Sequence, residues 1–165
     1  MSENLLALDQ ASQVSGYSIF IDGKLVKYGK ITLKDEEIGP RLVTLRKTII
    51  DLIKEYNITQ IAFEDIQMQA SVGNNVKTFK VLANVYGVIL ELCEELKLKY
   101  EIVSSNTWKS TLKIKGKGRA EQKRAAQAFV QETYGIKCSQ DEADAICIGS
   151  HMLKNSDSIG LNWAD

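Results

Sequence analysis

The sequence has little of several residue types, and each shortage argues against a class of protein. Its three cysteines, Cys93, Cys138 and Cys147, are odd in number and share no C-x-x-C spacing. They therefore indicate neither a disulfide framework nor a zinc site, and Cys93 and Cys147 are typical of small core residues. The formal net charge is zero, so the total charge gives no reason to expect a polyanionic partner.

Long hydrophobic runs are also missing. No apolar stretch is long enough to cross a bilayer, and the acidic Glu3 so close to the start is untypical of a signal peptide. We therefore expect a cytoplasmic protein without a membrane partner. With 165 residues and 44% hydrophobic composition, the chain can bury a substantial core, and we expect one domain over residues 1–165.

Short β-prone runs open the chain. Residues 5–8 are apolar and lead directly into Asp9, which is typical of a buried strand that ends at a carboxylate. Residues 15–21 and 24–31 are two further β-prone runs separated by Asp22-Gly23, a strong hairpin signal. The opening segment is predicted to be a three-stranded meander.

A second apolar run, over residues 60–66, carries Glu64 near its end. An amphipathic helix predicted over residues 40–56 connects it to the meander, so a right-handed crossover would pair this strand parallel to the first. Glu64 would then lie beside Asp9. With a fifth strand over residues 99–104, the prediction is an α/β fold: a five-stranded mixed sheet, a three-strand meander plus two parallel strands, flanked by helices.

A long helix predicted over residues 76–98 has two apolar stripes. One contains Phe79, Leu82, Tyr86, Ile89, Cys93 and Leu96; the other contains Val81, Val85, Val88 and Leu92. One stripe can cover the sheet, and we hypothesise that the second forms a homodimer. The alternative is that other helices of the same chain bury it.

Basic residues concentrate between positions 109 and 124. This segment has seven basic residues and one acid, a local net charge of +6. Such a run is either solvated surface or a contact for a phosphate backbone. The basic residues are Lys109, Lys113, Lys115, Lys117, Arg119, Lys123 and Arg124, and Lys77 and Lys80 at the start of the long helix are further candidates for DNA contact.

The last predicted helix begins with acidic residues. Ser139-Gln140-Asp141-Glu142 matches a capping box, so Ser139 should cap a helix whose first turn contains Asp141 and Asp144. Asp141 shares a face with residues that would pack on the sheet, and Asp144 lies at the edge of that face. A purely capping role could explain Asp141 through the helix dipole, but it explains Asp144 poorly.

Asp9, Glu64, Asp141 and Asp144 could thus converge. Two carboxylates about 4 Å apart repel by roughly 4 kcal/mol at an effective dielectric constant near 20, so such a cluster needs cations or protons. Carboxylate oxygens suit Mg²⁺ or Mn²⁺. Two such ions can hydrolyse a phosphodiester, and the basic segment then indicates nucleic acid as substrate.

The motifs LALDQAS, SGYSIF, IAFEDIQMQ and DEADAICIG, with the basic segment before the last, resemble the RuvC family of Holliday junction resolvases, which have a ribonuclease H-like fold. The resemblance implies a homodimeric endonuclease that cuts four-way DNA junctions by paired symmetric nicks, with two Mg²⁺ ions per active site and Mn²⁺ as a substitute. It also implies that Asp9, Glu64, Asp141 and Asp144 bind the metal and that Lys109 and Lys123 lie near the scissile phosphate.

The chain departs from the family pattern at two places. It has Gln10-Ala11 after Asp9 where the family usually has Pro-Gly, and Gln67 where an aromatic residue is common. These departures suggest a divergent branch, such as a phage-encoded resolvase acting in a bacterial host, with broader cutting of branched DNA. Whether a branch-migration motor is a partner stays open.

Two rival functions remain. A ribonuclease H-type enzyme would use the same metal geometry on RNA paired with DNA, and a DNA-binding module without chemistry would use only the basic segment. An ATPase of the actin and sugar-kinase fold is disfavoured, because the chain is too short for its second domain. The lone His151 is expected to be a partly exposed helical residue, and Trp108 a packed one.

Overall fold

The structure is a computed structural model that describes residues 3–67 and 75–163, with side chains described for 3–67 and 76–155. Its centre is a five-stranded sheet in the order β3-β2-β1-β4-β5. The strands are β1 (Asn4–Asp9), β2 (Val14–Ile21), β3 (Lys24–Thr32), β4 (Gln60–Glu64) and β5 (Lys99–Val103). The predicted mixed sheet is confirmed.

The meander forms where the sequence predicts it. β1 and β2 pair antiparallel, and so do β2 and β3. Asp22 and Gly23 connect β2 to β3 with positive φ angles of 50° and 81°. Two successive positive φ angles give a tight turn whose twist matches that of the strands, which explains the Asp-Gly pair.

The parallel half of the sheet is also as predicted. β4 pairs parallel with β1, and β5 pairs parallel with β4. β1 is therefore the central strand of the sheet, between one antiparallel and one parallel neighbour. The ends of β1 and β4 that carry Asp9 and Glu64 lie at the same edge.

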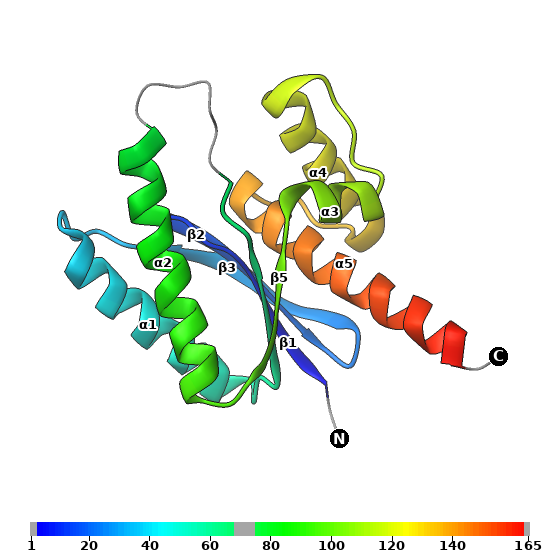
Figure 1. Cartoon of the computed structure of the whole chain (residues 1–165). Coiled ribbons are helices and arrows are strands. Elements are labelled where there is room, and N and C mark those ends of the chain that lie inside the picture. The colour runs from blue at the N-terminus through cyan, green and yellow to red at the C-terminus, as the bar shows by residue number, and fades with distance from the viewer. Residues whose placement is uncertain (1–2, 68–74, 164–165) are drawn as a thin grey trace.

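Helices cover both faces of the sheet (Figure 1). One face is covered by α1 (Ile38–Glu55) and α2 (Asn75–Glu95). The other is covered by α5 (Gln140–Trp163), beside which lie α3 (Ser105–Thr111) and α4 (Gly118–Tyr134). We call these the α1/α2 face and the α5 face.

The two apolar stripes predicted for the long helix are not separated as expected. Val85 and Leu92 of the supposed outer stripe are fully buried in the core of the α1/α2 face, together with Ile89 and Cys93. α1 packs against α2, and Arg46 of α1 forms ion pairs with two glutamates of α2. The alternative, burial within the chain, is therefore correct for half of that stripe.

The prediction for His151 was wrong. Its side chain is only 2% exposed, and its Nδ1 lies 2.9 Å from the Thr111 hydroxyl of α3. Burial lowers the pKa of His151, so the ring is a neutral contact between α5 and α3. Cys93 and Cys147 are buried as predicted. Among the described residues, no helix combines the length and apolar character that a bilayer crossing requires.

Candidate active site

Strand alternation places the first two carboxylates on one side of the sheet. In β1, Leu6 and Leu8 pack on the α1/α2 face, whereas Leu5 and Ala7 pack on the α5 face. Side chains alternate with a period of two, so Asp9 follows Leu5 and Ala7. In β4 the same alternation puts Glu64 on the α5 face with Ala62.

The start of α5 brings the other two carboxylates to the same place. The Ser139 hydroxyl accepts a hydrogen bond from the Glu142 N–H, and the Glu142 carboxylate accepts one from the Ser139 N–H, which confirms the predicted capping box. Gly16 lies under this turn, where a Cβ atom would stand 1.9 Å from the Asp141 carbonyl oxygen. Because Gly16 pairs with Asp9 in the sheet, α5 begins directly over the end of β1.

All four predicted carboxylates line one cleft of about 470 Å³. Its walls come from the ends of β1 and β4 and from α2, α3, α4 and α5. Besides Asp9, Glu64, Asp141 and Asp144, it is lined by Gln10, Ala11, Asp65, Ile66, Gln67, Leu82, Ser105, Trp108, Lys109, Gly118, Arg119, Gln122 and Lys123.

The carboxylates of the cleft disfavour one another's charge. Burial raises the pKa of Asp9 well above its ordinary value, and the charges of Glu64 and Asp144 raise it further. Burial also raises the pKa values of Glu64 and Asp144. Nearby cations act in the opposite direction, chiefly Lys123 on Asp144. The cleft therefore favours a bound positive charge.

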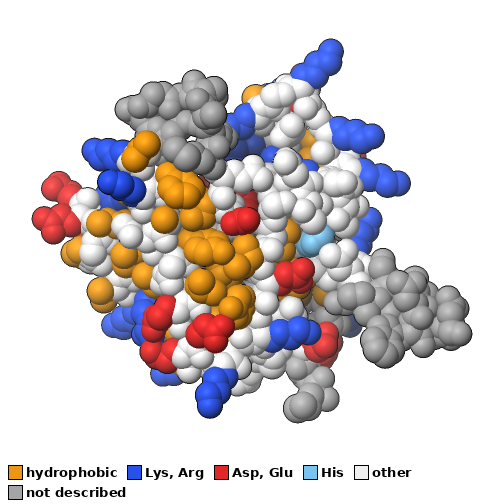
Figure 2. All heavy atoms as spheres, in the orientation of Figure 1, with side chains coloured by type: hydrophobic (Ala, Val, Ile, Leu, Met, Phe, Trp, Pro, Cys, Tyr) orange, Lys and Arg blue, Asp and Glu red, His pale blue; other side chains and the backbone are white. Residues whose placement is uncertain are grey.

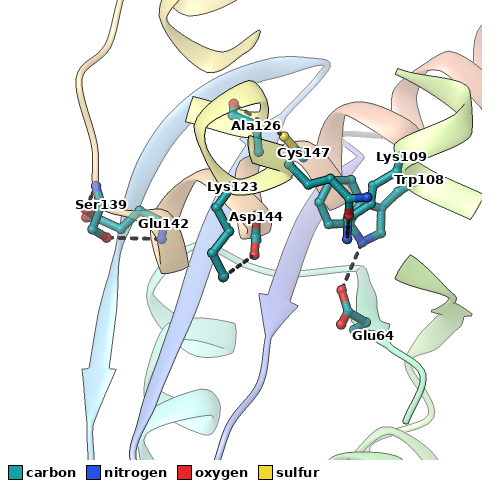
Figure 3. A network of polar contacts seen from close by, with 10 residues as sticks. Glu64, Trp108, Lys109, Lys123, Ala126, Ser139, Glu142, Asp144 and Cys147 are labelled. Atoms are coloured by element: carbon teal, nitrogen blue, oxygen red, sulfur yellow. Dashed lines mark hydrogen bonds and ion pairs between the residues drawn. The ribbon is translucent and has the colours of Figure 1, made fainter. Parts of the chain in front are cut away.

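A network of polar contacts joins the walls of the cleft (Figure 3). The Trp108 indole N–H donates to Glu64 Oε2 at 2.9 Å. Lys109 Nζ lies 5.4 Å from the centre of the Trp108 ring and donates to Gln122 at 3.0 Å. On the opposite side, Lys123 Nζ lies 3.4 Å from Asp144 Oδ2.

The donor set fits a hard divalent cation, since it offers carboxylate oxygens and neither nitrogen nor sulfur ligands. Within the part of the chain that the structure describes, no three acidic, His or Cys side chains lie close enough to hold an ion as they stand. Trp108 binds one carboxylate oxygen of Glu64, and Lys123 pairs with Asp144. Sharing an ion with Glu64 would require Asp144 to leave Lys123 and turn toward the strand ends.

The predicted nucleic-acid-binding residues divide into two groups. Lys109, Arg119 and Lys123 line the cleft. Figure 2 shows basic side chains along the α3–α4 side of the molecule, outside the central apolar patch. The exposed residues that are not part of the cleft lining are Lys113, Lys115 and Lys117 before α4, and Lys77 and Lys80 at the start of α2.

Sequence reasoning assigned no site role to five polar residues of the cleft: Gln10, Asp65, Gln67, Ser105 and Gln122. It also predicted a packed Trp108, which is correct at 1% exposure, but not its hydrogen bond to Glu64. Asp65 could have been found from its position directly after Glu64. Gln10 and Gln122 carry no local signal, because their contacts join residues that are far apart in the chain.

The fold is ribonuclease H-like: a mixed sheet of this strand order flanked by helices, with acidic residues at the ends of two neighbouring strands. The family model described as "Crossover junction endodeoxyribonuclease RuvC" matches residues 5–150. The chain belongs to the RuvC family. Membership in this family implies dependence on a divalent metal ion.

Relatives support the same assignment. A crossover junction endodeoxyribonuclease RuvC of Sulfurovum sp. (strain NBC37-1) is 30% identical over 139 residues, which is 81% of this chain and 82% of that protein. The protein of the same description from Legionella pneumophila (strain Lens) is 26% identical over 161 residues, 90% of this chain and 87% of the relative.

Solved structures share the fold. T. thermophilus RuvC in complex with Holliday junction substrate superposes with a TM-score of 0.69 at 13% identity, covering 88% of this chain and 89% of that one. The Fowlpox virus resolvase, in complex with Holliday junction DNA, gives a TM-score of 0.57 at 14% identity, covering 92% and 97%. At these identities the likeness establishes the architecture alone.

Proposed function

We propose that this protein is a Mg²⁺-dependent, structure-selective DNA endonuclease that resolves Holliday junctions by paired symmetric nicks. The observation that carries the proposal is the convergence of Asp9, Glu64, Asp141 and Asp144 on one cleft that also contains basic side chains. Membership in the RuvC family and the names of the relatives support the same activity. An acidic cleft alone would repel a polyanion such as DNA. The basic side chains in its wall therefore support a nucleic-acid substrate.

The four carboxylates would hold the ions. Two bound Mg²⁺ ions would supply an activated water for in-line attack on phosphorus and would stabilise the leaving oxygen. Lys109 and Lys123 are half-buried at the cleft and would contact the phosphate beside the scissile bond. Lys123 Nζ lies 3.4 Å from Asp144 Oδ2, so a phosphate bound beside Asp144 would be within its reach.

The remaining basic residues would bind the arms of the junction. Lys113, Lys115 and Lys117 are exposed on the segment that precedes α4, and Lys77 and Lys80 are exposed on α2. Contacts to phosphate fix the position of a duplex without reading its sequence. These residues would therefore contribute affinity for branched DNA and little sequence preference.

The test is incubation of a synthetic four-way junction with the protein, with and without Mg²⁺, beside an RNA–DNA hybrid duplex of equal length. The proposal expects paired symmetric nicks in the junction only, and only with the metal. Cutting of the hybrid alone would favour a ribonuclease H-type enzyme. Junction binding without any metal-dependent cutting would favour a non-catalytic module.

The proposal includes a homodimer formed through α2. Figure 2 shows hydrophobic side chains gathered over α2 on one face of the molecule. Val81 and Val88 are half-buried, although they alternate with the fully buried Val85 and Leu92. Two copies joined here would carry two clefts, as paired nicks require.

Light scattering tests the dimer. One chain has a mass of 18.4 kDa, so the proposal expects twice that mass at micromolar concentration. Replacing both Val81 and Val88 by Glu should give the single-chain mass with an unchanged circular dichroism spectrum, because the two residues are not part of the buried core. A single-chain mass for the unmodified protein would contradict the dimer.

A further inference from the structure

Gln10 holds the backbone of Glu64. Its side-chain Nε2 donates to the Glu64 carbonyl oxygen at 2.5 Å, and its Oε1 accepts from the Glu64 N–H at 3.0 Å. The pairing of β1 with β4 ends at Leu8 and Phe63, one position before the two carboxylates. The Gln10 amide thus replaces the next rung of the ladder at the point where the two strands separate to form the cleft.

Trp108 binds the side-chain carboxylate of Glu64. Its indole N–H donates to Glu64 Oε2 at 2.9 Å, and the ring is packed in the core of the α5 face with Leu112 and Ile114. At 1% exposure, the indole has no room to change rotamer. Glu64 is therefore fixed at its backbone by Gln10 and at one carboxylate oxygen by Trp108, while Oε1 carries neither of these bonds.

The contact of Asp144 is of a different kind. Lys123 Nζ approaches Asp144 Oδ2 at 3.4 Å, at the long end of a hydrogen bond, from a flexible and half-buried side chain. Lysine can leave when a competing charge arrives. Gln10 and Trp108, which bind Glu64, are neutral, so an incoming charge does not displace them. Their hydrogen bonds to Glu64 should therefore persist when a metal ion binds in the cleft.

We propose that Gln10 and Trp108 are positioning residues that present Glu64 to the metal, an inference that rests on the proposed function of this cleft. A ligand oriented in advance by partners outside the coordination sphere binds its ion more tightly, and loss of such a partner typically costs about 10–100-fold in metal affinity or activity. The role also gives a reason for Gln10, one of the residues at which this sequence departs from the family pattern.

The test measures metal binding in the absence of DNA, by calorimetric titration with Mn²⁺. Gln10→Met keeps the length of the side chain without its amide, and Trp108→Phe keeps an aromatic ring without the N–H. Each is expected to weaken Mn²⁺ binding by about 10–100-fold. Junction binding without metal should be unchanged, because neither group faces the DNA with a charge.

Matched controls separate positioning from stability. Gln127 of α4 donates to the Cys138 carbonyl at 2.9 Å, and Gln127→Met removes a backbone-binding glutamine away from the cleft. Tyr134→Phe removes the hydroxyl contact to Ser150 in the same helical layer. Both controls should keep the Mn²⁺ affinity of the unmodified protein, whatever they do to its melting temperature.

A double-variant cycle sharpens the result. In a Glu64→Gln background, Gln10→Met and Trp108→Phe should cause no further loss of Mn²⁺ affinity, because both residues act through the Glu64 carboxylate. Independent losses in that background would assign them a role elsewhere and overturn the inference. If Trp108→Phe does not fold by circular dichroism, the cycle with Gln10→Met decides.

The outcomes distinguish this inference from the proposed function. Equal Mn²⁺ affinity of Gln10→Met and the unmodified protein overturns the inference, even if junctions are nicked normally. A protein that binds Mn²⁺ but does not nick junctions overturns the proposed function, and the variants' affinities still decide the role of Gln10. An unmodified protein that binds no Mn²⁺ overturns both.

Discussion

The two faces of the sheet carry side chains of different size. On the α1/α2 face, the central strands contribute Leu6, Leu8, Ile61 and Phe63, all fully buried. On the α5 face, the same two strands contribute Leu5 at the start of β1 and then only Ala7 and Ala62 toward the carboxylates. The large residues hold two helices at ordinary packing distance, whereas the small ones let a single helix lie close to the strands.

This difference explains why the chemistry lies on one face. Near the cleft, β2 adds two more small residues: Gly16, and Ser18, whose hydroxyl donates to the Ala145 carbonyl of α5 at 2.7 Å. The large Phe20 lies farther along β2, against Gly149 of α5. α5 therefore touches the sheet through its backbone, and its first turn delivers Asp141 and Asp144 to the strand ends. A larger residue at Gly16 would displace that turn.

The largest expected effect comes from removing a charge on the α5 face. Asp144→Asn should reduce nicking of a four-way junction by about a thousandfold, since metal ions contribute several kcal/mol to the transition state and each 1.36 kcal/mol is tenfold in rate. Single-turnover nicking measures the loss, and a gel-shift assay should show retained junction binding. Asp51→Asn, on the exposed side of α1, is the control that should cut normally.

The second-largest effect is expected from enlarging one of the small residues under α5. Gly16→Ala would place a Cβ 1.9 Å from the Asp141 carbonyl, so α5 must shift. Overpacking typically costs about 1–3 kcal/mol of the free energy of unfolding, and a displacement of about 1 Å in a catalytic group can cost about a hundredfold in rate. Chemical denaturation and nicking per folded molecule measure the two effects. Normal nicking would show that the close approach of α5 does not set the site.

A variant on the α1/α2 face should lose stability but not activity. Leu45 of α1 is fully buried beneath the sheet, and Leu45→Ala should lower the free energy of unfolding by about 2–5 kcal/mol. Nicking per folded molecule should be unchanged, because the cavity forms away from the cleft. A loss of activity comparable to that of Gly16→Ala would remove the distinction between the two faces.

Stability should depend on pH through the α5 face. The pKa values of Asp9, Glu64 and Asp144 are raised in the folded protein. The folded state thus binds protons more tightly than the unfolded state, and the free energy of unfolding should fall as pH rises from about 4 through the raised pKa values.

Mg²⁺ should counter that loss. At a free concentration of about 100 times the dissociation constant, it should add about 2.7 kcal/mol at neutral pH. The gain should disappear near pH 4, where the carboxylates are protonated. Thermal melts over this pH range measure both effects, and Asp144→Asn should weaken both. A Mg²⁺ effect that is the same at pH 4 and pH 8 would place the ion elsewhere.

The smallest effect is expected outside the cleft. Lys115→Ala and Lys117→Ala should each weaken junction binding modestly and reduce the slope of log affinity against log salt by about one. Their side chains are exposed and are not part of the cleft lining, so the nicking rate of bound junction should not change. An unchanged salt slope would move the DNA contacts to another surface.

The sequence by itself determined most of the framework. Alternation, the Asp22-Gly23 turn and the capping box at Ser139 are local patterns, and each is confirmed because its energy comes from neighbours within a few residues. The order of the motifs also identified the family. The same patterns predicted that Asp9 and Glu64 lie at strand ends and that Asp141 and Asp144 lie early in the last helix.

Tertiary structure decided the rest. Half of the outer stripe of α2 is buried because α1 crosses it, and His151 is buried because α3 packs over it. The bonds of Gln10 and Trp108 to Glu64 span 54 and 44 residues of chain. No short-range periodicity encodes such contacts, since they depend on which elements the completed fold brings together.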